Sequence, residues 1–294
     1  MSNRHVYRRT VTPVAGRRVR PVRPVRRASA RLSVARAGAA LAMLASAGAI
    51  YGVGASSAFV YANLRVDGAV YTDPAVAETA VAAARGQNLF RLSTGPLRVA
   101  LERLPTVASA SVGVALPGTL QVTLTERVPV LIWKVGARRY LADDGGVLFG
   151  RLGDKLPPQA AGLMVIDDRR AASAGLSVGT HLDPQDVDAA TRLASLVPTD
   201  VGSAAKALQV RVTDENGFVV RADPQGWLAI FGFYTPSLRT PDLIPGQVRL
   251  LRSLLIGREP LIARIVLASE TEGTYVPKPT PRPTADPGAS PASP

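Results

Sequence analysis

The residues best suited to chemistry in this chain are a serine between two glycines and several acids that stand close together. Gly175-Leu176-Ser177-Val178-Gly179 has the spacing of the nucleophile elbow of α/β-hydrolases. Such an elbow needs a helix directly after the serine and a histidine far downstream. Here His181 follows four residues later, and Asp183-Pro184 then opens a new segment. The pattern therefore favours a glycine-containing loop, with His181 as a surface or half-buried residue beside a helix start.

The acids do not have the spacing of a metal or acid–base site. Those that stand close together are Asp143, Asp144, Asp167, Asp168, Asp183, Asp186 and Asp188. The two adjacent pairs would point to opposite faces of a strand, and the last three lack the spacing and the terminal Glu of a calcium loop. The chain has no cysteine, which excludes disulfides, zinc–thiolate sites and thiol nucleophiles. We therefore predict no catalytic residue, no metal and no cofactor. A membrane-anchored hydrolase, which would lack its base, is the least favoured alternative.

Charge is concentrated at one end of the chain. The sequence carries 35 Lys and Arg against 22 Asp and Glu, a formal net charge of +13. Residues 1–36 hold eleven arginines and no acid, so the other 258 residues are nearly neutral, with 24 basic against 22 acidic side chains. A globally basic nucleic-acid-binding domain is therefore excluded.

An uncharged stretch of 28 residues, Ala37–Leu64, follows the arginines. About 20 apolar residues span the hydrocarbon core of a bilayer, so we expect a transmembrane helix over residues 37–62, with Tyr61 at the far interface. A signal peptide cleaved at Ala45-Ser46-Ala47 is the alternative, but the uncharged run continues for 17 residues beyond it. The positive-inside rule places residues 1–36 in the cytoplasm and the bulk of the chain outside.

Both ends of the chain are predicted to be disordered tails. Residues 1–36 are rich in Arg and Pro, and their positive charges repel one another. Such a composition is typical of a disordered topogenic tail, which sets the orientation of the chain in the membrane. Contact with the anionic inner leaflet and binding of nucleic acid are alternatives; the second is disfavoured because Tyr7 is the tail's only aromatic residue apart from His5. Residues 276–294 contain seven prolines, which is typical of an extended polyproline segment.

Residues 63–130 have the pattern strand, helix, helix, strand, strand, which predicts a compact α+β module. Asp73 is the expected N-cap of the first helix and Pro74 its first residue. The expected apolar faces are Leu64 and Val66 on the first strand, Val76, Ala80, Ala83 and Ala84 on the first helix, Leu97, Leu101 and Leu104 on the second helix, Ala108, Ala110, Val112, Val114 and Leu116 on the second strand, and Leu120, Val122 and Leu124 on the third.

Five segments of this region resemble, in order, the POTRA domain of the FtsQ/DivIB family of bacterial cell-division proteins. They are Leu64–Gly68, Gly86–Phe90, Leu104–Val112, Leu116–Val122 and Glu126–Val130. In physical terms, the second segment would end a helix and bury Leu89 and Phe90 against the sheet. At the end of the module, Glu126 and Arg127 form either a charged domain junction or a solvated ion pair.

Residues 131–275 are predicted to be mostly β. The expected strands cover 131–133, 138–142, 147–149, 208–212, 218–220, 227–233 and 261–267. One helix is expected to begin at Asp183-Pro184, and its apolar face would consist of Val187, Ala190, Ala194 and Val197. A second helix is expected over residues 248–255. This layout resembles the second extracytoplasmic domain of the same family, a mixed sheet with flanking helices. In the last strand, Val266-Leu267-Ala268 departs from the Asp-Leu-Arg-like motif that is frequent in the family.

The resemblance implies a partner contact at the C-terminal end of this β-domain, to single-pass proteins of the FtsB and FtsL type. On this chain the contact residues would be Arg264, Ile265, Val266, Leu267 and Tyr275. A free sheet edge there would accept a strand from the partner. Alternatively, Ile265 and Leu267 are core-facing residues of an edge strand, and both roles are compatible because faces alternate.

The resemblance therefore implies a non-enzymatic, bitopic scaffold of the bacterial divisome that links early and late division proteins during septum formation. It would lie in the cytoplasmic membrane at the septum and bind neither nucleic acid nor a small-molecule substrate. The alternative is a POTRA-containing accessory of protein translocation or envelope assembly. That alternative is disfavoured because the Gly-x-Asn-Leu-Phe word occurs once and no run of barrel strands follows.

Overall fold

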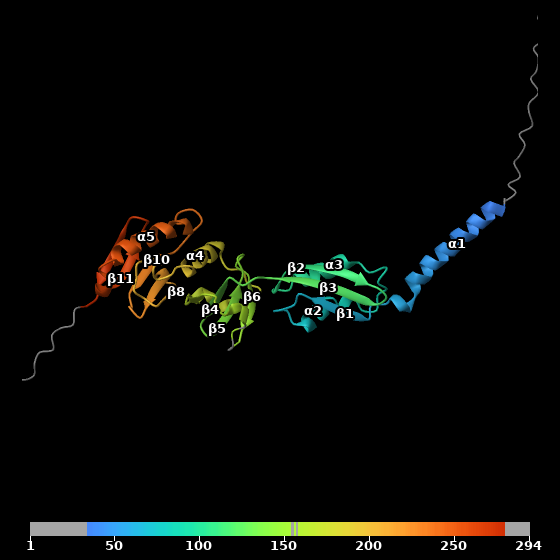
Figure 1. Cartoon of the computed structure of the whole chain (residues 1–294), viewed down its shortest axis with the longest axis horizontal. Coiled ribbons are helices and arrows are strands. Elements are labelled where there is room, and N and C mark those ends of the chain that lie inside the picture. Colours follow the sequence, from blue (N-terminus) through green and yellow to red (C-terminus); the bar gives the residue numbers. More distant parts are fainter. Residues whose placement is uncertain (1–33, 154–155, 157, 280–294) are drawn as a thin grey trace, which may run out of the picture. The chain divides into compact units, whose positions relative to one another are not determined.

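The computed structural model describes residues 34–153, 156 and 158–279 (Figure 1). The predictions for residues 1–33 and 280–294 therefore lie outside the described residues. The chain divides into two compact units at Gly52, within the first helix, and each is described by itself.

Helix α1, Val34–Ala55, has 22 residues, a mean hydropathy of 1.5 and no buried side chain. At 1.5 Å per residue it is about 33 Å long, enough to cross a bilayer core of about 30 Å. The helix ends seven residues before the end of the predicted segment, because the chain turns at Ser56 into the short 3₁₀ helix η1, Ser57–Phe59. Tyr61 is 8% exposed within a hydrophobic cluster, so its predicted place at the membrane interface is wrong.

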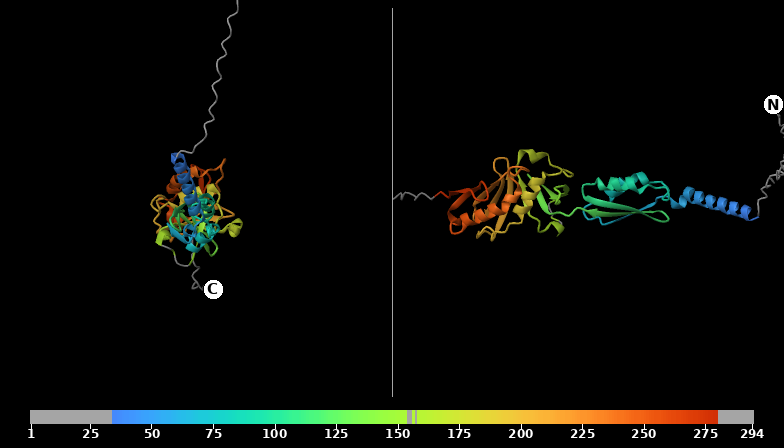
Figure 2. Two further views of the ribbon diagram at one scale, coloured as in Figure 1. Left: turned by 90° about the vertical axis from the view of Figure 1, so that its right-hand side faces the viewer. Right: turned by 90° about the horizontal axis from the view of Figure 1, so that it is seen from above.

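The first folded module has the predicted order of elements. It consists of β1 (Asn63–Asp67), α2 (Pro74–Ala80), η2 (Ala82–Ala84), α3 (Thr94–Glu102), β2 (Val107–Ala115) and β3 (Thr119–Glu126). The sheet order is β1-β3-β2, with β1 parallel and β2 antiparallel to β3. The ribbon of this module is drawn from cyan to green in Figure 2. Residues of α2 and α3 pack with Leu120, Val122 and Leu124 in one core.

Two predicted faces of this module are correct only in part, and Val114 and Leu116, predicted on the apolar face of the second strand, are exposed. On the first helix the buried residues are Ala77, Val81 and Ala84, whereas Val76 is 46% exposed. These three residues stand at positions i, i+4 and i+7, so the buried stripe has helical spacing but begins one residue later than predicted. On β2, a register irregularity between Val107 and Ser109 turns Val107 inward and leaves Ala108 exposed.

The second module is built on a sheet of nine strands. They are β4 (Leu131–Val135), β5 (Arg138–Ala142), β6 (Leu148–Leu152), β7 (Val165–Asp168), β8 (Ala207–Thr213), β9 (Gly217–Asp223), β10 (Leu228–Gly232), β11 (Ile262–Leu267) and β12 (Gly273–Pro277). Their order is β12-β11-β10-β9-β8-β7-β4-β5-β6. The sheet is mixed, as predicted, with parallel pairs β4–β7, β7–β8 and β10–β11.

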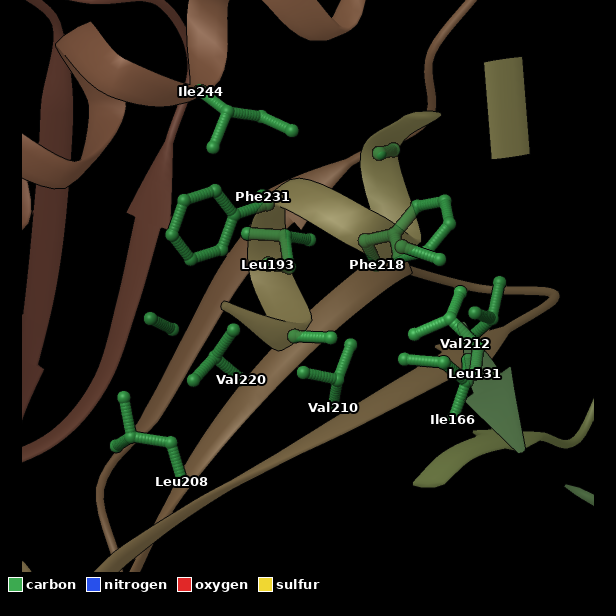
Figure 3. Close-up of a cluster of buried hydrophobic side chains, with 14 of the residues drawn as sticks. Leu131, Ile166, Leu193, Leu208, Val210, Val212, Phe218, Val220, Phe231 and Ile244 are labelled. Carbon is green, nitrogen blue, oxygen red and sulfur yellow. The ribbon is translucent and has the colours of Figure 1, made fainter. Parts of the chain in front are cut away.

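Two helices, α4 (Pro184–Ala194) and α5 (Ile244–Leu255), pack on this sheet over its main hydrophobic core. The core includes Leu193 of α4, Ile244 of α5 and Phe231 of β10 (Figure 3). Short 3₁₀ helices connect the elements: η3 (Pro158–Ala160), η4 (Ala171–Gly175), η5 (Pro241–Leu243) and η6 (Glu259–Leu261). The predicted core residue Val197 is 50% exposed, because the helix ends at Ala194, ahead of Pro198.

Two strands are not among the predicted elements. β7 has only four residues, and its last two are acids, so its pattern is not that of an apolar strand. β12 pairs with β11 in an antiparallel hairpin, and it includes Val276 and Pro277, which the sequence assigns to the extended tail.

Candidate partner-binding edge and domain junction

Glu126, at the end of β3, holds the loop between β1 and α2. Its carboxylate accepts the backbone N–H groups of Val70 at 2.8 Å, Tyr71 at 2.8 Å and Thr72 at 2.7 Å. Burial raises the pKa of this carboxyl, but the hydrogen bonds from Thr72, Tyr71 and Val70 outweigh that effect, and the pKa is lowered from 4.5. The ionised form of Glu126 therefore stabilises the fold.

Arg127 connects the first module to the second. Its Nε donates to Pro105 O at 3.0 Å, and its Nη1 donates to Asp143 Oδ2 at 2.6 Å. Asp143 is almost fully buried and also accepts the Val147 N–H at 2.7 Å, in the turn between β5 and β6. Glu126 and Arg127 thus contact separate partners on the two sides of the boundary, a geometry suited to the predicted junction role.

The predicted partner segment is not at a sheet edge. β11 pairs with β10 on one side and with β12 on the other, so a partner strand has no place beside β11 in this fold. The reason is that Gly273–Pro277 folds back as a further strand. Ile265 and Leu267 are buried in the core, whereas Arg264 and Val266 lie on the opposite, exposed face. A role of these four residues in partner binding stays a prediction.

Among the described residues, the edge at this end of the sheet is β12. Tyr275 is paired with Ile265 and is 44% exposed, and Val276 is paired with Arg264 and is 52% exposed. Large apolar side chains are therefore exposed on both faces of the edge strand, and one side of its backbone has no neighbour among the described strands. Such an edge is a template for pairing with another chain.

The turn before β12 fixes where the edge lies. Ser269 Oγ accepts the N–H groups of Thr271 at 3.2 Å and Glu272 at 3.0 Å. A Cβ on Gly273 would lie 3.1 Å from Leu250 Cδ2 and 3.1 Å from Val266 O, so a larger residue would push β12 away from α5 and β11. The glycine therefore permits the close approach of this hairpin to the helix.

Two polar side chains hold the carboxyl ends of β10 and β11 together. Arg239 Nη2 donates to Phe231 O at 2.6 Å and to Leu267 O at 2.7 Å, and its Nη1 donates to Ala268 O. Gln247 of α5 donates to the same two carbonyls, Phe231 O at 3.3 Å and Leu267 O at 3.2 Å. These bonds fix the strand from which the β12 hairpin starts.

The sequence contains a signal for one of these two residues. Gln247 stands between Ile244 and Leu251 on the apolar stripe of α5, and a polar residue in such a stripe indicates a buried hydrogen-bonding role. Arg239 and Asp143 lie in loop and turn segments without periodicity, and no local pattern indicates their partners.

The segments that suggested chemistry have structural roles. Ser177 lies in a loop between η4 and α4, as expected, and its hydroxyl lies 3.4 Å from Thr180 Oγ1. Asp167 and Asp168 point to opposite faces, and Asp168 is fully buried, where it accepts the Trp133 Nε1–H at 3.0 Å and pairs with Arg170 at 2.8 Å. Burial raises the pKa of Asp168, but the hydrogen bonds from Arg170 and Ser173 outweigh it and lower that pKa.

Comparison with known proteins identifies the first module. The family described as "POTRA domain, FtsQ-type" matches residues 61–127. The chain is 36% identical over 84 residues to the cell division protein FtsQ of Corynebacterium glutamicum, covering 29% of this chain and 38% of that protein. It is 28% identical over 154 residues to the FtsQ protein of Streptomyces coelicolor, covering 52% of this chain and 58% of that protein. It is also 25% identical over 177 residues to the FtsQ protein of Chloroflexus aggregans, covering 60% and 62%.

The βααββ POTRA module and the mixed β-domain define a POTRA-containing protein, and its N-terminal helix is long and apolar enough to cross a membrane. The family match and the curated relatives then narrow this description: residues 61–127 match a POTRA domain of the FtsQ type, and the chain is similar to proteins named cell division protein FtsQ, which indicates a cell division protein. The matches span between 38% and 62% of the length of these three relatives.

We expect Arg127→Ala to lower the free energy of unfolding of the β-domain by about 1.5–3 kcal/mol, because buried Asp143 loses a charged hydrogen-bond donor. Both tryptophans, Trp133 and Trp227, lie in the β-domain, so tryptophan fluorescence in urea follows that domain alone. Arg169→Ala, which removes the ion pair of an exposed arginine with Asp167 inside the β-domain, is the matched control and should change the result by less than about 0.5 kcal/mol. Equal effects of the two variants would contradict the junction role.

The contribution of Glu126 should depend on pH. A carboxyl whose pKa is lowered by folding stabilises the fold above its unfolded pKa, near 4.5, and loses that contribution as the pH falls through the folded pKa. The difference in Tm between wild type and Glu126→Gln should therefore be largest near about pH 7 and shrink below about pH 4.5. Thermal scans by circular dichroism at several pH values measure it, and a difference independent of pH would be inconsistent with this account.

Proposed function

We propose that this chain is a non-enzymatic, membrane-anchored scaffold of the bacterial division machinery. In this proposal α1 crosses the cytoplasmic membrane with the arginine-rich segment in the cytoplasm, and the POTRA and β-domains lie outside. The positive-inside rule supports the orientation, and the relatives named as cell division proteins support the process.

The observation that carries the proposal is the exposed edge at β12. A partner segment in extended conformation would add a strand there, and its backbone groups would pair with those on the outer side of β12. Tyr275 and Val276 would give specificity, because they flank the new strand on its two faces. The partners we propose are the FtsB-type and FtsL-type single-pass division proteins.

Arg264 and Val266 lie beside the edge strand. Arg264 is exposed on the same face as Val276, but its Nη2 donates to Asn216 Oδ1 at 3.0 Å, directly before β9, so the guanidinium is directed away from β12. Ile265 and Leu267 would act only indirectly, by fixing β11 to the core.

The POTRA module offers a second edge for other members of the division machinery. β2 is an outer strand of its sheet, nine residues long, and most of its side chains are Ala, Ser or Gly. Small side chains allow a partner to approach the backbone closely, so this edge suits docking of recruiting partners.

We expect the variant Tyr275→Ala/Val276→Asp to weaken binding of the purified FtsB-type and FtsL-type pair by at least about tenfold, because it removes two apolar contacts and puts a charge on the edge. Kd is measured by titration with the full chain in detergent micelles. Proline variants of Ile265 or Leu267 are less suitable, because both residues are buried and the β-domain itself would be disrupted.

Thr271→Ala is the matched control for the edge variant, since Thr271 is exposed in the same hairpin but outside β12. It should bind the pair as wild type does. An edge variant that keeps its circular dichroism spectrum and its full affinity would move the partner site away from β12.

The role in division has its own test. An N-terminal fluorescent fusion, expressed in growing cells of the source organism, should form a band at the division plane. The measurement is the ratio of septal to lateral membrane fluorescence in dividing cells. A uniform membrane signal would argue against the scaffold role and favour the accessory of protein translocation or envelope assembly.

A further inference from the structure

Two phenylalanine rings form an exposed pair just beyond the end of α1. The ring centroids of Phe59 and Phe90 lie 5.0 Å apart in an edge-to-face arrangement with an interplanar angle of 76°. Phe90 is 53% exposed and Phe59 is half-buried. The predicted burial of Phe90 against the sheet is therefore wrong, whereas Leu89, its neighbour, is 4% exposed in the core as expected.

The side chain of Asn88 explains why Leu89 is buried whereas the adjacent Phe90 is exposed. Its Nδ2 donates to Val53 O and Ser56 O, each at 3.1 Å, and its Oδ1 accepts the Phe90 N–H at 3.0 Å. The Leu89 N–H donates to Phe59 O at 2.8 Å. Asn88 thus satisfies carbonyls at the end of α1 and also holds the turn that directs Phe90 away from the core.

Chain connectivity limits how far this pair can lie from a membrane. Phe59 follows Ala55, the last residue of α1, by four residues, so the two backbones cannot be more than about 14 Å apart. The β2–β3 turn belongs to the same end of the module, because Gly118 O accepts the Ala62 N–H at 2.9 Å, and it carries Leu116, which is 54% exposed.

A cation accompanies these apolar groups. The exposed side chain of Arg91 lies against the last turn of α1, since a Cβ on Gly54 would be 3.2 Å from its Nε. Aromatic rings beside a cationic side chain are what the boundary between lipid headgroups and acyl chains favours: the rings enter the apolar edge and the guanidinium pairs with lipid phosphate.

We propose that Phe59, Phe90, Leu116 and Arg91 form a membrane-contacting tip of the POTRA module, which rests in the headgroup region of the outer leaflet of the membrane that α1 crosses. The tip assumes the interfacial role that the sequence assigned to Tyr61, whose ring is in the core instead. The occupant is the phospholipid surface itself, and no partner protein is needed.

The test uses the absence of cysteine from the chain, which allows single labelled sites. The full chain with Leu116→Cys, labelled with the fluorophore NBD, is placed in nanodiscs of phosphatidylcholine and phosphatidylglycerol that contain headgroup-spin-labelled lipid. Val70→Cys is the matched control, because Val70 is 64% exposed in the same module but follows the far end of β1. Quenching at 116 should be at least about twofold stronger than at 70.

Two further variants complete the test. Adding Phe59→Ser and Phe90→Ser to Leu116→Cys should reduce the quenching towards that of Val70→Cys, because the apolar contacts are lost. Ala47→Cys in α1 should be quenched by spin labels deep in the acyl chains. Equal quenching at 116 and 70, or no deep quenching at 47, would overturn the proposal. The first of these results would leave partner binding at β12 unaffected, so failure of the two proposals is distinguishable.

Discussion

The backbone hydrogen bonds that join β10, β11 and β12 support the C-terminal end of the β-domain. β11 runs parallel to β10 and therefore needs the crossover through α5, whereas β12 returns by a short turn. Arg239, in the loop after β10, and Gln247, in α5, both donate hydrogen bonds to the carbonyls at the ends of β10 and β11. The loop and the helix are therefore attached to the same strand ends. Without that support β12 would have no fixed neighbour, and the edge that carries the proposed function would not form.

Polar side chains also fix loops, junctions and helix ends elsewhere in the chain by hydrogen bonding to the backbone or to another side chain. Glu126 holds three N–H groups of a loop, Arg127 joins two modules, and Asn88 connects the end of α1 to the POTRA core. A further example is Glu259, which accepts the indole N–H of buried Trp227 at 2.8 Å. Each of these groups is placed where the chain changes direction, and each costs more to remove than an exposed ion pair would.

The sequence predicts the elements that have strong hydrophobic periodicity. It does not predict side-chain exposure or strand pairing where these depend on contacts between residues distant in the sequence. The POTRA order, the β8–β9 hairpin and the caps of α2 and α4 follow from local patterns. Phe90, by contrast, is apolar but exposed, because the hydrogen bonds of Asn88 determine its direction. β12 was missed because its residues stand beside a proline-rich segment and become a strand only through pairing with β11. The partner of Arg127 lies in a turn 16 residues away, which no local pattern shows.

The β12 edge also has a mechanical consequence. A strand added along β12 would be bonded to it at regular intervals over its length. A force along the strand axis would load all of these bonds at once, whereas a force across it would break them one after another. The lifetime of such an attachment under tension would therefore depend on the direction of pulling as well as on its equilibrium affinity.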